Sequence, residues 1–118
     1  MALYLKMDQH TWVQQDYTDS ASYDLSGTVY DENTFTTARD ISGFTGKFRL
    51  IDQEGKLLFS SDTGLTLNAD GTFTMTFGNG ATPFIHGNTK VRLLLEVSGS
   101  RLTAIGVNGS DEIFFEYD

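Results

Sequence analysis

Residues 64–77 read Gly-Leu-Thr-Leu-Asn-Ala-Asp-Gly-Thr-Phe-Thr-Met-Thr-Phe, and this stretch contains two short runs separated by a turn. In the second run, apolar residues alternate with threonines, which places the two kinds of side chain on opposite faces of a half-buried strand. Between the runs, residues 68–71 fit a type I turn followed by a glycine in the left-handed region. The stretch therefore predicts a β-hairpin that joins a strand at 64–67 to a strand at 72–77.

Short alternating runs of this kind recur along most of the chain. From Lys90 to Val97, the odd-numbered positions are all aliphatic and three of the even-numbered positions are charged. Gly, Asn and Asp separate the runs, and no window shows the i, i+3, i+4, i+7 apolar spacing of an amphipathic helix. The chain therefore predicts an all-β fold of about eight or nine short strands, as in a sandwich or small barrel. The further expected strands are 3–7, 24–30, 47–50, 56–60, 91–97, 101–107 and 112–117.

The N-terminal part of the chain differs in composition from the remainder. Residues 3–7 alternate as a strand does, but residues 8–22 are polar with interspersed aromatic side chains. We therefore expect residues 1–22 to form an arm or an extra edge strand, and residues 23–118 to form the β-sandwich domain. Because an exposed edge strand is a template for pairing with another chain, this N-terminal segment is a candidate connector.

Asn108-Gly109 is the strongest two-residue hairpin signal in the sequence, because both central positions of a type I′ turn need positive φ. A two-residue loop would place Thr103 opposite Phe114 and bring Ile105, Val107 and Phe114 together on one face. Such an apolar face would need a cover, either the N-terminal segment or another subunit. A four-residue loop with a shifted register is the alternative, and the pattern does not separate the two.

Composition limits the kinds of protein that the chain can be. Its 118 residues suffice for one domain with a single core. The absence of cysteine excludes disulfide scaffolds, thiol nucleophiles and cysteine-ligated metal centres. The net charge of −8 argues against binding to nucleic acid and to anionic membranes. No apolar run approaches the roughly 20 residues of a membrane span, and the N-terminus has no signal-peptide pattern, so we expect a protein made inside a cell.

No arrangement of residues typical of a catalytic or metal site is found in the sequence. The two histidines, His10 and His86, are far apart, and neither is part of a metal-binding motif. The acidic residues occur in loop-like clusters, where solvated turn carboxylates are expected rather than an acid–base pair. No serine has the surroundings of a nucleophile. We therefore expect no enzyme activity, no cofactor and no metal ion.

Residues 39–50 read Arg-Asp-Ile-Ser-Gly-Phe-Thr-Gly-Lys-Phe-Arg-Leu, and residues 51–56 add a turn with Asp and Gly. This block resembles a motif of tailed-phage proteins, in which Asp-Leu-Thr-Gly-Tyr-Thr precedes an alternating strand and such a turn. The resemblance, which covers residues 24–117, is to the immunoglobulin-like domain of phage baseplate upper proteins and related tail-appendage proteins. It implies a single immunoglobulin-like antiparallel β-sandwich and a scaffold without catalytic residues. Asp40 is expected to accept hydrogen bonds from backbone amides, and Gly43 to permit a sharp corner.

These observations favour a non-enzymatic structural or adaptor protein of a phage or prophage virion, in a tail, baseplate or head-decoration assembly. Its expected partners are other virion proteins and further copies of itself, and its expected location is the virion, assembled in the host cytoplasm. Docking would use edge-strand pairing and burial of an apolar patch. The candidate interface residues are Trp12, Val13, Tyr17, Ile105, Val107 and Phe114.

The alternative function is a carbohydrate-binding module that recognises host-surface glycans. Carbohydrate sites use exposed aromatic side chains as platforms for sugar rings. The candidate residues for such a platform are Trp12, Tyr17, Tyr23 and Tyr30.

Overall fold

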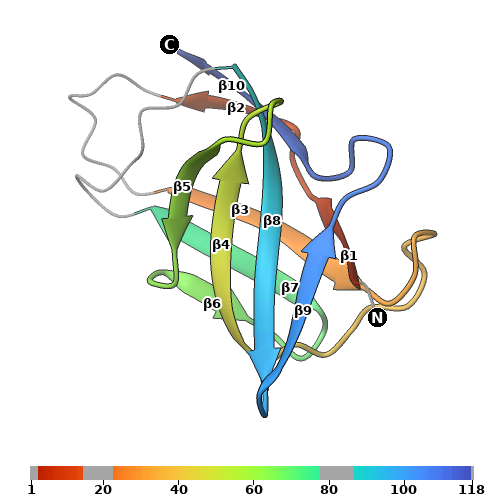
Figure 1. Cartoon of the computed structure of the whole chain (residues 1–118). Helices are drawn as coiled ribbons and strands as arrows, with labels where there is room; N and C mark the ends of the chain where they lie inside the picture. Colours follow the sequence, from red (N-terminus) through yellow and green to blue (C-terminus); the bar gives the residue numbers. More distant parts are fainter. Residues whose placement is uncertain (1–2, 15–22, 78–86, 118) are drawn as a thin grey trace.

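The computed structural model describes residues 3–14, 23–77 and 87–117, and every regular element within these ranges is a β-strand. All ten strands belong to one hydrogen-bonded sheet (Figure 1). The all-β fold expected from the sequence is thereby confirmed, and nothing in the described ranges forms a helix capable of crossing a membrane. The strands are Leu3–Met7 (β1), Thr11–Gln14 (β2), Tyr23–Tyr30 (β3), Thr45–Ile51 (β4), Leu57–Ser61 (β5), Leu65–Leu67 (β6), Thr72–Phe77 (β7), Gly87–Val97 (β8), Ser100–Ile105 (β9) and Glu112–Tyr117 (β10).

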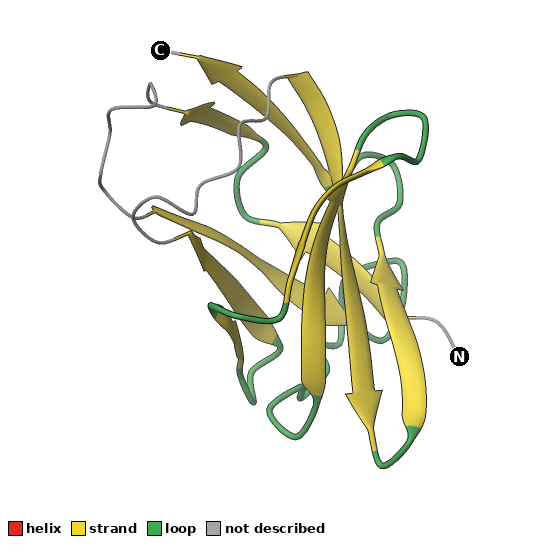
Figure 2. Ribbon diagram, turned by 60° about the vertical axis from the view of Figure 1, so that its left-hand side comes forward, coloured by secondary structure: helices red, strands yellow, loops and turns green. Residues whose placement is uncertain are grey.

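The sheet folds over on itself into the two layers of a sandwich. One layer contains β5, β4, β8 and β9, and the other contains β6, β7, β3 and β1, whose strands run across those of the first (Figure 1, Figure 2). The parallel pairing of β1 with β9 joins the layers at one side. At the other side β6 lies against β4, where a Cβ on Gly46 would be 3.1 Å from Leu65 Cδ2 and 3.2 Å from Leu67 Cδ1. Glycine at this position therefore leaves room for the leucines that close the sandwich.

Alternating apolar side chains from both layers meet in a single core. Phe48 and Leu50 of β4 face inward, as do the odd-numbered positions of β8 that the sequence pattern singled out. Burying each large apolar side chain contributes roughly 1.5–3 kcal/mol to folding. The fully or almost fully buried members of this core include Leu3, Leu5, Leu25, Val29, Ile41, Phe48, Leu50, Phe73, Met75, Val91, Leu93, Leu95, Ala104, Ile113 and Phe115.

The N-terminal strand β1 is an inner strand of the sheet. It pairs with β3 on one side and with β9 on the other, and its side chains Leu3, Leu5 and Met7 are at most 2% exposed. The expectation of an arm or extra edge strand is therefore wrong for β1. It holds for β2, which pairs in parallel with β10 at the end of the strand order.

The segment from β9 to β10 does not form the expected hairpin, because the two strands do not pair with each other. Both pair antiparallel with β8, with Ala104 opposite Leu93 and Glu112 opposite Lys90. From Leu93 to Lys90 the chain advances three residues along β8, whereas from Ala104 to Glu112 it advances eight residues. The loop at 106–111 between β9 and β10 therefore holds five residues more than the facing part of β8. Neither the two-residue nor the four-residue loop register is correct.

The turn chemistry within this loop is nevertheless as the sequence predicts. Asn108 and Gly109 have φ values of 54° and 83°, and Ser110 N–H donates to Val107 O at 3.0 Å. These are the features of a type I′ turn. The turn forms locally, but it lies in an insertion rather than at the tip of a two-stranded ribbon.

The turn at 68–71 also forms as expected and joins β6 to β7. Gly71 has a φ of 89°, and its N–H donates to Asn68 O at 3.2 Å. In the block that resembles the phage motif, Asp40 Oδ1 accepts hydrogen bonds from Ser42 N at 2.9 Å and Ser42 Oγ at 2.7 Å. Gly43 does not have a positive φ, and a Cβ there would meet no atom within 4 Å, so the expected corner does not depend on this glycine.

Candidate docking surface

The outer side of β4 and β8 carries a concentration of positive charge. Because Phe48 and Leu50 point into the core, the residues that alternate with them, Lys47 and Arg49, point outward. Five of the chain's eight lysines and arginines lie on this side of the layer that contains β4, β8 and β9. We call this set the cationic face; its members are Lys47, Arg49, Lys90, Arg92 and Arg101.

The centre of the cationic face is electrostatically unfavourable in the isolated chain. Arg49 lies directly opposite Arg92 across the β4–β8 ladder, and like charges in this position destabilise a sheet. Arg49 Nε is buried and, within the described part of the chain, has no hydrogen-bond partner. A buried donor without a partner costs about 1–3 kcal/mol. An anionic partner would relieve the repulsion between the two arginines.

Acidic residues compensate the margin of the cationic face but not its centre. Arg101 Nε forms an ion pair with Glu96 at 3.2 Å, and Lys90 lies opposite Glu112. Among the described residues, no ion pair is formed by Arg49 or Arg92. The unneutralised charge is therefore concentrated in the middle of the β4–β8 ladder, at Arg49 and Arg92.

Exposed apolar side chains lie next to this charge. Leu57 and Leu58 on β5 are 49% and 39% exposed, and Phe114 on β10 is 37% exposed. The register of β5 against β4 shifts between Leu50 and Ile51, where Leu58 is the extra residue between Phe59 and Leu57. Among the described strands β5 pairs with β4 alone, so its other edge can accept a further strand. Arginine beside exposed apolar groups is typical of protein–protein interfaces.

A cavity of about 740 Å³ opens beside the cationic face, where β4 begins and β8 ends. Its lining combines apolar residues of β6, β8 and β9 with three cations, Lys47, Arg49 and Arg101, and two carboxylates, Asp62 and Glu96. The recess is large enough to receive side chains from a protruding loop of another protein.

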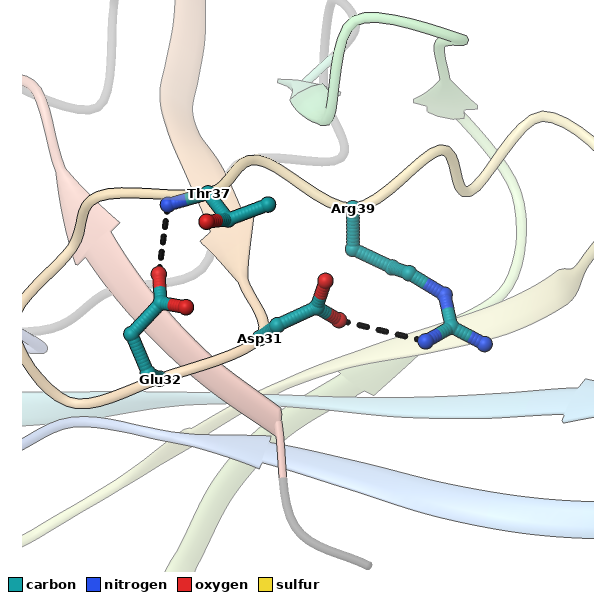
Figure 3. A network of polar contacts seen from close by, with 4 residues as sticks. All are labelled: Asp31, Glu32, Thr37 and Arg39. Carbon is teal, nitrogen blue, oxygen red and sulfur yellow. Dashed lines mark hydrogen bonds and ion pairs between the residues drawn. The ribbon is translucent and has the colours of Figure 1, made fainter.

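A second charged region, of opposite sign, is formed by the loop that follows β3 and by the β6–β7 turn. The loop is braced internally (Figure 3): Arg39 Nη1 lies 3.1 Å from Asp31 Oδ1, and Glu32 accepts hydrogen bonds from the backbone amides of Thr36 and Thr37. The loop and the turn are neighbours, because Ile41 N–H donates to Asn68 O at 3.3 Å. We call these segments the acidic loops; their carboxylates are Asp31, Glu32, Asp40 and Asp70.

Hydrogen bonds keep three of these carboxylates ionised. The backbone N–H of Thr37 lowers the pKa of Glu32, the hydroxyl of Ser42 lowers the pKa of Asp40, and the hydroxyl of Thr72 lowers the pKa of Asp70. Each bond favours the charged form of the acid. The acidic loops therefore present fixed negative charge at neutral pH.

The same hydrogen bonds predict how stability responds to acid. Carboxyls with a depressed folded-state pKa contribute stability above their ordinary pKa and lose it as pH falls through the folded value. The free energy of unfolding in urea should therefore decrease as pH falls below the ordinary values of 4.5 for Glu32 and 3.8 for Asp40 and Asp70. Glu32→Gln should make this decrease shallower, because it removes the carboxylate that accepts hydrogen bonds from Thr36 and Thr37. An equal slope in wild type and Glu32→Gln would contradict the assignment.

Of the interface residues expected from the sequence, Ile105 and Phe114 lie apart. Ile105 and Val107 are half-buried, and β1 lies beside Ile105 through its pairing with Tyr4. Phe114 is opposite Asn88, whereas Ala104 is opposite Leu93, so β9 and the exposed phenylalanine are separated by five positions of β8, or about 17 Å. The sequence predicted that the N-terminal segment or another subunit would cover this apolar face, and at Ile105 the neighbouring segment is the N-terminal strand β1.

The remaining expected interface and glycan residues are also dispersed. Trp12 and Val13 lie on β2 opposite residues of β10, and Tyr17 lies outside the described residues. Tyr23 and Tyr30 begin and end β3, seven residues or about 23 Å apart. Tyr30 packs edge-on against Phe35, with ring centroids 5.4 Å apart. Tyr23 and Tyr30 therefore do not belong to one aromatic platform.

Comparison with known proteins leaves the geometry of this surface as the main guide to function. No family model matches the chain, and no curated protein matches it. Within 3–14, 23–77 and 87–117, no three His, Asp or Glu side chains are grouped so that they could hold a metal ion. The cationic face was missed at the level of sequence because the net charge of −8 conceals it. The alternating cations at positions 47, 49, 90 and 92 were the available signal.

Proposed function

We propose that this chain is a non-enzymatic docking module, a structural or adaptor protein of a phage or prophage virion. It contacts its partner through the cationic face and the adjoining edge of β5. The observation that carries the proposal is the Arg49–Arg92 pair, in which two arginines that form no ion pair among the described residues are opposite each other on the β4–β8 ladder. A partner carboxylate is the group that best satisfies two arginines at once, because it can accept parallel hydrogen bonds from guanidinium groups.

The virion setting is supported by the resemblance of residues 39–50 to the immunoglobulin-like domain of phage tail proteins. Asp40 makes the backbone hydrogen bond that this motif implies. The turn that follows β4 is closed by Asp52 Oδ1, which accepts from Glu54 N at 2.9 Å and Lys56 N at 2.8 Å. These are scaffold roles, in accord with a domain that displays a surface.

The docking surface combines three kinds of interaction. The arginines provide charge-assisted hydrogen bonds, which are about twice as strong as neutral ones. Leu57 and Leu58 provide apolar area at an edge strand, and that edge can accept a further strand through backbone hydrogen bonds. Charge selects and orients the partner, and burial of the leucines holds it.

Particle incorporation tests the proposal directly. Tagged wild type and Arg92→Glu are expressed in the host that encodes the chain, and virions are purified in a density gradient. We expect wild type to band with the particles and Arg92→Glu to be reduced at least about tenfold, as when one partner of a buried charge pair is removed. Because Arg92→Glu places a carboxylate opposite Arg49, its melting temperature should not fall.

Lys6→Glu is the matched control, because it makes the same kind of charge change on the exposed side of β1, outside the cationic face and the edge of β5. Absence of wild type from the particles, or equal amounts of wild type and Arg92→Glu in them, would refute the proposal. A parallel glycan array addresses the alternative function: binding that is lost in Trp12→Ala would support a carbohydrate-binding module instead.

A further inference from the structure

We infer that the cationic face binds the acidic loops of a second copy of this chain, so that copies associate head to tail. The inference rests on the proposed docking function and names the partner. Two oppositely charged regions on one molecule carry it: the centre of the cationic face around Arg49 and Arg92, and the braced carboxylates of the acidic loops.

The distribution of charge makes a second copy a complementary partner. The chain has 16 acidic and 8 basic residues, and five of the basic ones belong to the cationic face. The other three are Lys6, Arg39 and Lys56, so surfaces away from the face are strongly acidic. The acidic loops combine four carboxylates with one cation of their own, Arg39, and the Nζ of Lys6 lies over the ring of Phe35 in the same loop, 5.7 Å from its centroid. A second copy therefore supplies the negative charge that is missing beside the Arg49–Arg92 pair.

The geometry favours contact between unlike surfaces rather than a symmetric dimer through the face. A two-fold interface would bring each cationic face against its own copy, which places like charges together. Face-to-loop contact instead uses two different surfaces on each molecule. Such a heterologous interface generates a ring if the rotation closes and a filament if it does not.

The acidic loops are suited in shape and rigidity to this contact. The segment after β3 extends beyond the edge of the sheet (Figure 1) and is tied down by the Asp31–Arg39 ion pair and by the amides that donate to Glu32. A preformed loop loses little conformational entropy on binding. The 740 Å³ recess beside the cationic face, whose lining has three cations, Lys47, Arg49 and Arg101, and two carboxylates, Asp62 and Glu96, provides a concave surface for it.

Sedimentation velocity of the full chain tests the inference at several salt concentrations. Between about 20 and about 500 mM NaCl the screening length falls from roughly 20 Å to roughly 4 Å. We expect wild type to form oligomers at low salt and to dissociate at high salt. Arg92→Asp and Asp40→Lys should each weaken association at least about tenfold. The double variant, in which the charges are exchanged, should regain association.

Thermal melting verifies that each variant is folded, and Asp70→Lys replaces Asp40→Lys if the latter is not. Asp24→Lys on β3 is the control, because it makes the charge change of Asp40→Lys at an exposed position outside the cationic face, the edge of β5 and the acidic loops. A folded wild type that stays monomeric at every salt concentration would overturn the inference, as would association that is insensitive to the face and loop variants. The proposed function is judged separately by particle incorporation: a monomeric chain that still requires Arg92 for incorporation docks to a different virion protein.

Discussion

Removal of residues 1–7 should unfold the protein, because it takes away an inner strand rather than an arm. β1 buries Leu3, Leu5 and Met7, and each such side chain contributes roughly 1.5–3 kcal/mol. Their sum approaches the whole stability of an ordinary domain, which is about 5–15 kcal/mol. The truncation also exposes the edges of β3 and β9 that β1 covers. Far-ultraviolet circular dichroism and urea unfolding should show no cooperative transition.

Two further experiments make this prediction specific. Leu5→Ala should lower the free energy of unfolding by about 2–5 kcal/mol, as for other buried leucines, whereas Lys6→Ala on the exposed side should have little effect. A synthetic peptide of residues 1–10, added to the truncated chain, should restore the cooperative transition by reinserting β1. A truncated chain with the urea midpoint of wild type would show that β1 is dispensable, as an arm would be.

The features that sequence reasoning predicted well are the ones determined by neighbouring residues. Alternation located the strands at 3–7 and 72–77 with their observed bounds. Turn chemistry identified the positive φ values of Asn108 and Gly109, because a type I′ turn is specified by the residues within it. In these cases the local preference and the final structure agree.

The features that were predicted wrongly depend on contacts between distant segments. Alternation in 3–7 shows that one face is buried, but not that β1 lies between β3 and β9. The five-residue insertion at 106–111 depends on which residues β8 presents to its partner. The four residues of β2 show no clear alternation, and they form a strand because β10 offers an edge beside them.

The candidate surface was concealed for the same reason. The alternating cations of β4 and β8 are visible in the sequence as the polar positions of two strands. Only the pairing of β4 with β8, more than thirty residues apart in the chain, places Arg49 opposite Arg92. The negative net charge of the whole chain gives no sign of this local concentration of cations.

The insertion at 106–111 is where a single added methyl group should have a large effect. A Cβ on Gly106 would overlap with the side chain of Asp111, which is itself buried. The loop connects two strands: Asp111 O accepts from Val91 N at 2.8 Å, and Ser110 O accepts from Met7 N at 2.8 Å. Gly106→Ala should therefore displace the loop from both β8 and β1.

We expect Gly106→Ala to lower the free energy of unfolding by at least about 3 kcal/mol, from overpacking of about 1–3 kcal/mol and loss of buried hydrogen bonds of about 1–3 kcal/mol each. Urea unfolding measures the loss, and faster amide exchange at Met7 and Val91 should accompany it. Gly43→Ala is the control, because a Cβ there meets nothing within 4 Å. Asp111→Gly removes the atoms that the new methyl group would overlap, so it should recover part of the loss when combined with Gly106→Ala. If the double variant is no more stable than the sum of the single effects predicts, steric overlap with Asp111 is not the cause.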